Sequence, residues 1–331
     1  MESDSQRSKS YRRELHDLVQ KACTDGEMGS MPMRSLLLNE AQYCHHVSQN
    51  AFTIEHSLDT WIDNFRENLP HVTHNNKAGF NVPHTDRKAL VIGAGPSALT
   101  YYGHLKDKGL FTVCTNKSLE FLIRNGIEPD VVVVLHSTPE IKGTINTKVV
   151  SDYLGQEGRL KSDFIIPTTI DPGVFWEIAH ISRSTHHHWF NPSIPEEQVE
   201  NINQFMERMT GLPVIDTGGD VGVFALLMAL EMTTGPVGII GLEHCLALNE
   251  NWTNEQALGY RIEYAPESYE MLYAIPPSFQ VTLDTMVKLC NSKGKGRVYN
   301  LSNFGPVYAR KLLPYMAMED FACQNKEPTN C

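Results

Sequence analysis

The chain has 331 residues, and 41% of them are hydrophobic, which is enough apolar material for one large or two modest domains. The formal net charge is −11 at pH 7, with 28 Lys and Arg against 39 Asp and Glu, and this argues against a nucleic-acid partner. The seven cysteines include no Cys-x-x-Cys pair, so neither a disulfide framework nor a zinc site is expected. No apolar run reaches the roughly 18–20 residues of a membrane span, and the polar N-terminus does not resemble a signal peptide. We therefore expect no membrane span and a cytoplasmic location.

The first 87 residues predict an N-terminal helical region and a linker. Residues 1–50 are polar, contain two possible amphipathic helices and offer no catalytic pattern. Ser57–Pro70 combines capping residues with an apolar stripe at helical spacing, which predicts a further helix. Residues 71–87 are rich in His, Asn and Pro, so we expect a boundary between a helical region (1–87) and a catalytic domain (88–322), which is followed by a short tail (323–331).

From residue 88 onward, short apolar strands alternate with helical segments. The expected strands are Ala89–Ile92, Phe111–Thr115, Val131–Leu135, Asp163–Pro167, Pro213–Asp216 and Val237–Ile240. The expected helices are Ser97–Lys108, Lys117–Asn125, Gly173–Ile181, Glu196–Thr210 and Gly219–Thr233. The C-terminal part predicts a helix over Phe279–Asn291, a strand from Arg297 that ends in polar residues, and a final helix from about Val307 to Phe321. This order predicts an α/β fold with a doubly wound, mostly parallel Rossmann-like sheet.

Ligands of such sheets bind at the carboxyl ends of the strands, so the residues after each strand are the candidates. Gly93, Gly95, Pro96 and Ser97 follow the first strand and open a helix. The glycines let the backbone approach a ligand, and the helix N-terminus attracts an anion. The pattern predicts either a phosphate site or a simple tight turn.

The end of the second strand argues against a dinucleotide. An NAD site places an acidic residue there to bind the ribose, whereas this chain has Asn116 between Thr115 and Lys117. Asn116 is therefore a candidate nucleotide contact, with helix capping as the alternative. A second glycine-rich turn, with Thr217, Gly218 and Gly219, opens another apolar helix. Two such turns in one sheet predict a two-sided cleft for a mononucleotide.

Three histidines are candidate bases. His136 follows the third strand, His188 ends a run of three histidines, and His244 follows another strand, and we rank them in this order as catalytic candidates. A structural role is the alternative for each. Alternate strand residues point in opposite directions, so three consecutive histidines cannot share one metal, and no metal site is expected. Further candidate substrate contacts are Ser137, Glu243, Asn300 and Ser302.

These motifs together resemble the Maf-type family. The resemblance rests on the order Gly-Ala-Gly-Pro-Ser, Asn-Gly-Ile-Glu-Pro-Asp, Thr-Gly-Gly-Asp-Val-Gly and Ile-Ile-Gly-Leu-Glu, and it covers roughly residues 57–320. The family includes motility accessory factors, which transfer nonulosonic acids to flagellin, and archaeal 6-hydroxymethyl-dihydropterin diphosphokinases. The chain departs from the usual pattern at Ala98, where Leu is usual, and at His136 and Glu243, where Asp is usual.

The resemblance implies a transferase with a nucleotide-linked donor. In a nonulosonic-acid glycosyltransferase, Gly93–Ser97 would hold the phosphate of a CMP-sugar, Asn116 would contact the nucleotide, and Thr217–Gly219 would lie beside it. The acceptor would be a protein or a glycan. In a pterin diphosphokinase, ATP and Mg²⁺ would be required, and Asp130, Asp220 and Glu243 are the available carboxylates. A third alternative is a non-catalytic nucleotide-binding protein; the oligomeric state stays open.

Overall fold

The computed structural model describes residues 57–73, 80–105, 109–135, 145, 147–154, 158–183, 187–194, 201–247, 261–265 and 271–323. The expected helices within residues 1–50, the candidates His136 and Ser137, and the tail after residue 323 lie outside these ranges. Within the described part of the chain, no helix is long and apolar enough to cross a membrane.

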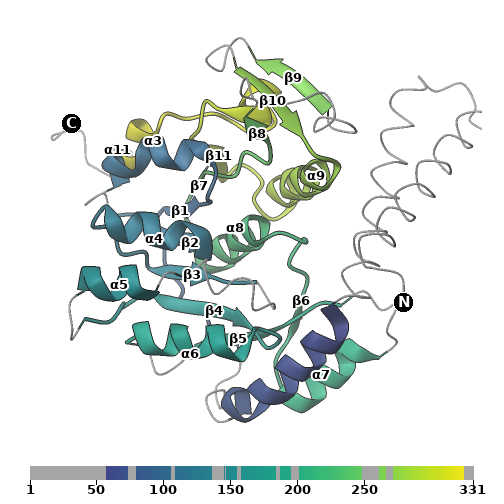
Figure 1. The fold of residues 1–331 in the computed structure, drawn as a ribbon. Coiled ribbons are helices and arrows are strands. Elements are labelled where there is room, and N and C mark those ends of the chain that lie inside the picture. The colour runs from purple at the N-terminus through teal and green to yellow at the C-terminus, as the bar shows by residue number, and fades with distance from the viewer. Residues whose placement is uncertain are drawn as a thin grey trace, which may run out of the picture.

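The core of the fold is an eight-stranded sheet in the order β11-β7-β1-β2-β3-β4-β5-β6, and all its pairings are parallel (Figure 1). Its strands are β1 (Ala89–Ile92), β2 (Phe111–Thr115), β3 (Val131–Val133), β4 (Asp163–Pro167), β5 (His188–Pro192), β6 (Val214–Ile215), β7 (Val237–Ile240) and β11 (Val298–Asn300). The central strands are buried on both faces, as expected of a parallel sheet covered by helices. The predicted doubly wound parallel sheet is confirmed.

Helices cover both faces of the sheet (Figure 1). One face carries α3 (Pro96–Leu105), α4 (Asn116–Arg124), α5 (Thr147–Leu154), α6 (Pro172–Ile181) and α11 (Met318–Cys323), whose apolar side chains share one core cluster. The other face carries α8 (Val221–Met232), α9 (Pro277–Ser292) and α10 (Gly305–Ala309), which share a second cluster. Helix α8 is apolar around its whole circumference because it lies between the sheet and α9.

The direction of the chain across the sheet reverses next to β1. From β1 the chain steps through β2, β3, β4, β5 and β6 in one direction, and it then crosses back to place β7 on the other side of β1. The connections after β1 and β7 therefore lead to opposite faces of the sheet, with α3 on one face and α9 on the other. Such a topological switch point is where sheets of this kind bind ligands, so it directs attention to residues 93–97 and 241–245.

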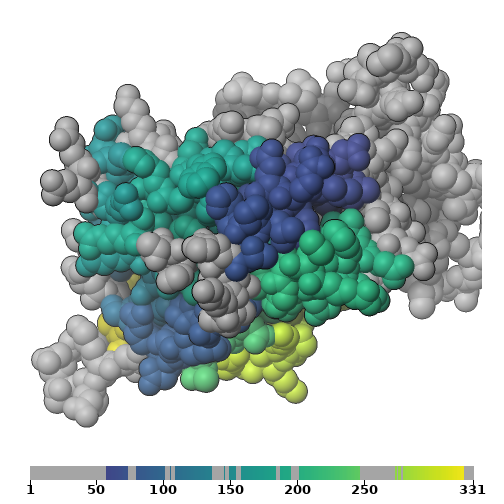
Figure 2. All heavy atoms as spheres, turned by 90° about the horizontal axis from the view of Figure 1, so that it is seen from below, coloured from purple at the N-terminus to yellow at the C-terminus, as the bar shows by residue number. Residues whose placement is uncertain are grey.

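The helix over residues 57–73 packs at the other end of the sheet, beside α7 (Ile202–Thr210) and α6 (Figure 2). Phe65 packs with Ile194 and Met206 in a small apolar cluster. Asn68 is fully buried, and its Nδ2 donates to the carbonyl oxygens of Thr168 (3.1 Å) and Ile170 (2.8 Å), just beyond β4. The predicted helix is confirmed, but it continues past Pro70 to residue 73, and these contacts fix it against the sheet.

Several other elements differ from the prediction. The expected final helix over 307–321 is wrong: α10 ends at Ala309 and α11 begins at Met318, because Lys311 has a φ of +52° and Pro314 lacks an N–H. Strand β5 was not predicted, since His188–Pro192 has no simple alternation. A second, antiparallel sheet of β8 (Leu246–Ala247), β10 (Met271–Ile275) and β9 (Arg261–Ala265) was also missed.

Candidate functional site

The loops after β1 and β7 are in direct backbone contact. The N–H of Gly93 donates to the carbonyl oxygen of Ile240 (2.8 Å), and the N–H of Gly95 donates to that of Gly241 (2.9 Å). A Cβ on Gly93 would overlap the Gly241 carbonyl oxygen. The first glycine is therefore required by the close approach of the neighbouring turn, which a sequence pattern alone could not distinguish from an approaching ligand.

The side chain of Glu243 lies on the turn between β1 and α3. The hydroxyl of Ser97 donates to Oε1 of Glu243 and accepts from the N–H of Gly241 (2.9 Å). A Cβ on Gly95 would overlap Oε2 of Glu243, so the carboxylate covers the bare face of that glycine. Because Ser97 belongs to the first turn of α3, the carboxylate lies at the N-terminus of that helix, where a negative charge is favoured.

Glu243 is buried more deeply than an ionisable group usually is. Only 3% of the residue is exposed. Burial raises the pKa of its carboxyl above the ordinary value of 4.5, and hydrogen bonds from the Ser97 side chain and from nearby backbone N–H groups offset part of that rise. Within the described residues, Oε2 is buried and has no hydrogen-bond partner.

His244 lies next to Glu243 and faces α9. Its Nδ1 is 3.2 Å from the hydroxyl of Thr282, and Nε2 is buried without a hydrogen-bond partner in the described part of the chain. Burial lowers the pKa of the imidazole below the ordinary value of 6.5, and the negative charge of Asp220 offsets part of this change. A neutral imidazole with a free ring nitrogen can accept a proton, so the geometry suits a general base.

The second glycine-rich turn ends at the N-terminus of α8. Oδ1 of Asp220 accepts from the N–H groups of Gly222 (2.8 Å) and Val223 (3.1 Å), so Asp220 caps this helix. Gly218 and Gly219 have φ values of +68° and +74°, which explains why glycine occurs there. Thr217 precedes them and is half-buried.

This turn also contacts the loop after β7, because a Cβ on Gly222 would overlap the side chain of Leu242. The loop at residues 241–244 therefore contacts the turns that open both α3 and α8. The structure thus brings Gly93, Gly95 and Ser97 together with Glu243, and it places the start of α8, which follows Thr217–Gly219, against the same loop.

Asn116 lies at the carboxyl end of β2, as the first residue of α4, and is fully buried. Two residues later, the hydroxyl of Ser118 donates to the carbonyl oxygen of Ile92 (3.2 Å), which ties the start of α4 to the end of β1. Asn116 is therefore placed at the same edge of the sheet as Gly93–Ser97, one strand away from it.

Asn300 is the last residue of β11, Ser302 follows two residues later, and their polar groups stabilise the turn between them. Nδ2 of Asn300 donates to the Ser302 carbonyl oxygen (2.7 Å), and Oδ1 of Asn300 accepts from the Ser302 N–H (3.2 Å). The hydroxyl of Ser302 accepts from the N–H of Phe304 (3.0 Å). Both residues line a small hollow beside Glu243, so they lie next to the site while their polar groups shape the backbone.

His188 is not brought to this edge. It is the first residue of β5, and its Nε2 is 3.8 Å from Oδ2 of Asp163, the first residue of β4. Both residues lie at the amino ends of their strands, whereas the glycine-rich turns lie at the carboxyl ends. Thr282, in contrast, contacts His244 and was missed, because a threonine in the middle of α9 gives no sequence signal.

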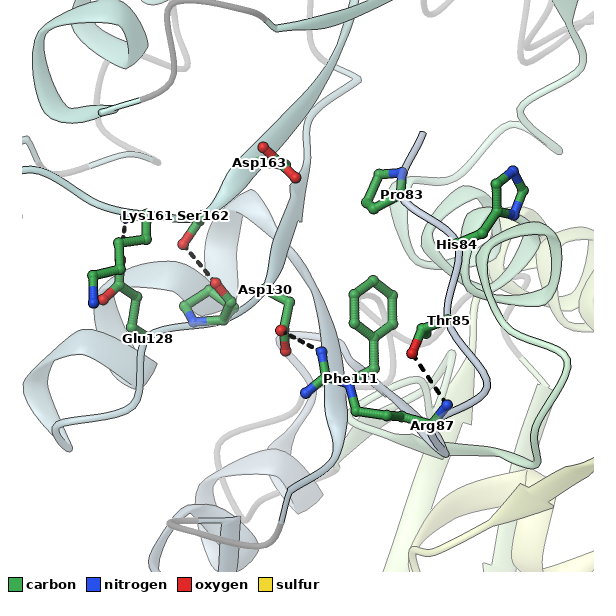
Figure 3. A pocket seen from close by; sticks show the side chains of 11 residues that line it. Pro83, His84, Thr85, Arg87, Phe111, Glu128, Asp130, Lys161, Ser162 and Asp163 are labelled. Carbon is green, nitrogen blue, oxygen red and sulfur yellow. Dashed lines mark hydrogen bonds and ion pairs between the residues drawn. The ribbon is translucent and has the colours of Figure 1, made fainter. Parts of the chain in front are cut away.

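A pocket of about 460 Å³ lies at the amino ends of the strands, opposite the glycine-rich turns (Figure 3). Arg87 and Asp130 form an ion pair there (2.7 Å), and Arg87 lies over the ring of Phe111. Asp130 also accepts from the N–H (2.8 Å) and hydroxyl (2.9 Å) of Thr112. These pairings between residues of the chain, together with the position at the amino ends, make this pocket a weaker candidate than the switch point.

Comparison with known proteins places the chain in a family. No curated protein sequence matches it. Among solved structures, it resembles the Maf glycosyltransferase from Magnetospirillum magneticum AMB-1 with a TM-score of 0.49 and 15% sequence identity; the match covers 78% of this chain but only 40% of that protein. Residues 60–248, more than half of the chain, match the family described as 6-hydroxymethylpterin diphosphokinase MptE-like. The chain therefore belongs to the MptE-like family.

Proposed function

We propose that the protein is a transferase that binds a nucleotide-linked donor over the loops after β1 and β7, at the carboxyl edge of the sheet. The observation that carries this proposal is the convergence of two helix N-termini, those of α3 and α8, on the loop at the topological switch point. In this structure, the carboxylates of Glu243 and Asp220 occupy these N-termini. Both positions therefore accommodate anionic oxygens, and a donor phosphate has the same requirement.

The proposed donor is a CMP-linked nonulosonic acid, and the proposed acceptor is a hydroxyl of a protein or glycan in the cytoplasm. The bond between the sugar carbon and the phosphate oxygen breaks, and the acceptor oxygen bonds to that carbon. Ser97 and the N-terminus of α3 stabilise the departing phosphate, while Nε2 of His244 accepts the acceptor proton. Asn116 contacts the nucleotide from the end of β2. His136 remains a second candidate base.

The family description favours a second candidate, a 6-hydroxymethylpterin diphosphokinase. That reaction uses ATP with Mg²⁺, which needs carboxylates near the phosphates. Asp220 and Glu243 lie at the required edge of the sheet, whereas Asp130 pairs with Arg87 at the opposite edge. In the part of the chain that the structure describes, no group of three metal-binding side chains occurs. A magnesium ion bound with ATP needs only one or two protein carboxylates, because the substrate phosphates supply further oxygen ligands, so Asp220 and Glu243 are the candidate ligands.

A thermal-shift titration distinguishes these candidates. Stabilisation by CMP without magnesium supports glycosyl transfer, and stabilisation by ATP only in the presence of magnesium supports diphosphate transfer. Nucleotide binding without turnover of a CMP-linked sugar or of ATP with a pterin alcohol would indicate a non-catalytic protein. If CMP, UMP, ADP and GDP all leave the melting temperature unchanged, the donor site is wrong.

A further inference from the structure

We propose that the side chain of Glu243 occupies the binding site of the donor phosphate and must leave this site before the donor can bind. The inference rests on the proposed function, since it concerns the same site. It makes Glu243 an internal competitor of the donor rather than a group that contacts it.

The Glu243 carboxylate lies where a phosphate would bind. In a glycine-rich turn that binds a nucleotide, the second glycine leaves its Cα bare so that phosphate oxygens can approach the backbone. In this chain that glycine is Gly95, and Oε2 of Glu243 covers its bare face. Oε1 of Glu243 meanwhile accepts the hydrogen bond of Ser97, the hydroxyl nearest to the N-terminus of α3. A phosphate in this turn would need the same space and the same donor.

While Glu243 fills the phosphate-binding site, not every buried polar atom there has a hydrogen-bond partner among the described residues. Oε2 of Glu243 and Nε2 of His244 are both buried without a hydrogen-bond partner in the described part of the chain. A buried polar atom without a partner destabilises the state that contains it. The unsatisfied Oε2 of Glu243 therefore favours an exchange in which a ligand replaces the carboxylate.

The backbone around Glu243 offers a way to make this exchange. Gly241 has a φ of +71° and His244 has a φ of +49°, so two left-handed residues bracket the segment that carries Glu243. Histidine rarely adopts this backbone conformation, and surrounding contacts hold it there. Rotation at these two positions is the route that we infer for withdrawing the Glu243 side chain, and it would release the hydrogen bonds of Gly241 with Gly95 and Ser97.

The test compares Glu243→Ala with the wild-type protein by isothermal titration with CMP and, separately, with inorganic pyrophosphate. If Glu243 competes for the phosphate-binding site, its removal tightens the binding of both ligands by at least about tenfold. The reason is that the protein no longer has to move the carboxylate out of the site before it binds the ligand. Glu231→Ala is the matched control: it removes one negative charge from the surface of α8, where Glu231 pairs with Lys293. We expect its affinities to equal those of the wild type.

Each other outcome has a definite meaning. If CMP binds equally to the wild type and to Glu243→Ala, the competitor role is overturned and the proposed donor site stands. If neither protein binds CMP or pyrophosphate, both proposals fail. Should Glu243→Ala not fold, Glu243→Gln replaces it, and a gain in affinity of the same sign but smaller size is expected, since a neutral amide is held less strongly at the N-terminus of α3. If the affinity of Glu243→Gln equals that of the wild type, the inference is overturned.

Discussion

The hydroxyl of Ser97 links the two loops of the site, because it accepts from the Gly241 N–H and donates to Glu243. Ser97 and Glu243 are 146 positions apart in the chain. The sequence left two interpretations open for the glycines beside Ser97, a phosphate site or a simple tight turn. In the structure, Gly93 and Gly95 make room for Gly241 and Glu243, and a local pattern cannot show so distant a contact.

The raised pKa of Glu243 predicts a pH dependence of stability. Between pH 4.5 and the higher pKa of the folded protein, the unfolded chain has lost this proton while the folded chain retains it. The free energy of unfolding of the wild type therefore falls as the pH rises through this window, by up to about 1.4 kcal/mol per pH unit from this group. Glu243→Gln lacks this contribution, and urea unfolding at several pH values measures the difference. A difference that does not grow with pH would contradict the account.

The two described histidine candidates can be separated by substitution. We expect His244→Ala to lower kcat by about 10²–10⁴-fold, with little change in KM for the donor, because the imidazole would accept the acceptor proton. We expect His188→Ala to leave kcat near the wild-type value, since His188 lies at the opposite edge of the sheet. Steady-state kinetics with a CMP-linked donor tests both. A larger kcat loss in His188→Ala would reverse the assignment.

At the scale of elements, the helix over residues 57–73 is attached through specific polar contacts as well as apolar packing. Asn68 holds two backbone carbonyl groups beyond β4, and Phe65 anchors the apolar cluster beside α7. The sequence predicted the helix from its caps and stripe but placed it in a region before a linker. Which surface a helix packs against depends on tertiary contacts that its own periodicity does not contain.

Asn68→Ala tests this attachment. The substitution leaves the carbonyl oxygens of Thr168 and Ile170 buried without their donor, so we expect a loss of about 2–3 kcal/mol in the free energy of unfolding. Arg66→Ala on the same helix is the control, because Arg66 is exposed and its pair with Asp63 lies at the surface. Urea denaturation compares the two. Equal, small losses would show that Asn68 does not hold the helix.

The start of α8 provides a second prediction at this scale. Asp220→Ala removes the side-chain oxygen that caps Gly222 and Val223, and we expect it to destabilise the protein by about 1 kcal/mol. Asp220→Asn retains a capping oxygen and should lose much less. If both variants unfold at the same denaturant concentration as the wild type, the cap does not contribute.

At the scale of the whole molecule, alternating strands and helices were sufficient to predict the doubly wound parallel sheet. The order of its strands was not predictable, because nothing in β6 or β7 indicates that the chain crosses back to β1. That crossing creates the switch point and brings residues 93–97 and 241–244 together, beside the first turn of α8. In the small sheet of β8, β9 and β10, β8 has only 2 residues, which is too short for a sequence pattern to show.

We propose above that the donor phosphate binds at the switch point between β1 and β7. A crystal structure of the protein with CMP tests it most directly. We expect the phosphate to lie on Gly93–Ser97, within hydrogen-bond distance of the Ser97 hydroxyl, and the Glu243 carboxylate to be withdrawn from Gly95. CMP bound elsewhere, for example in the pocket lined by Arg87 and Lys161 at the opposite edge of the sheet, would contradict it.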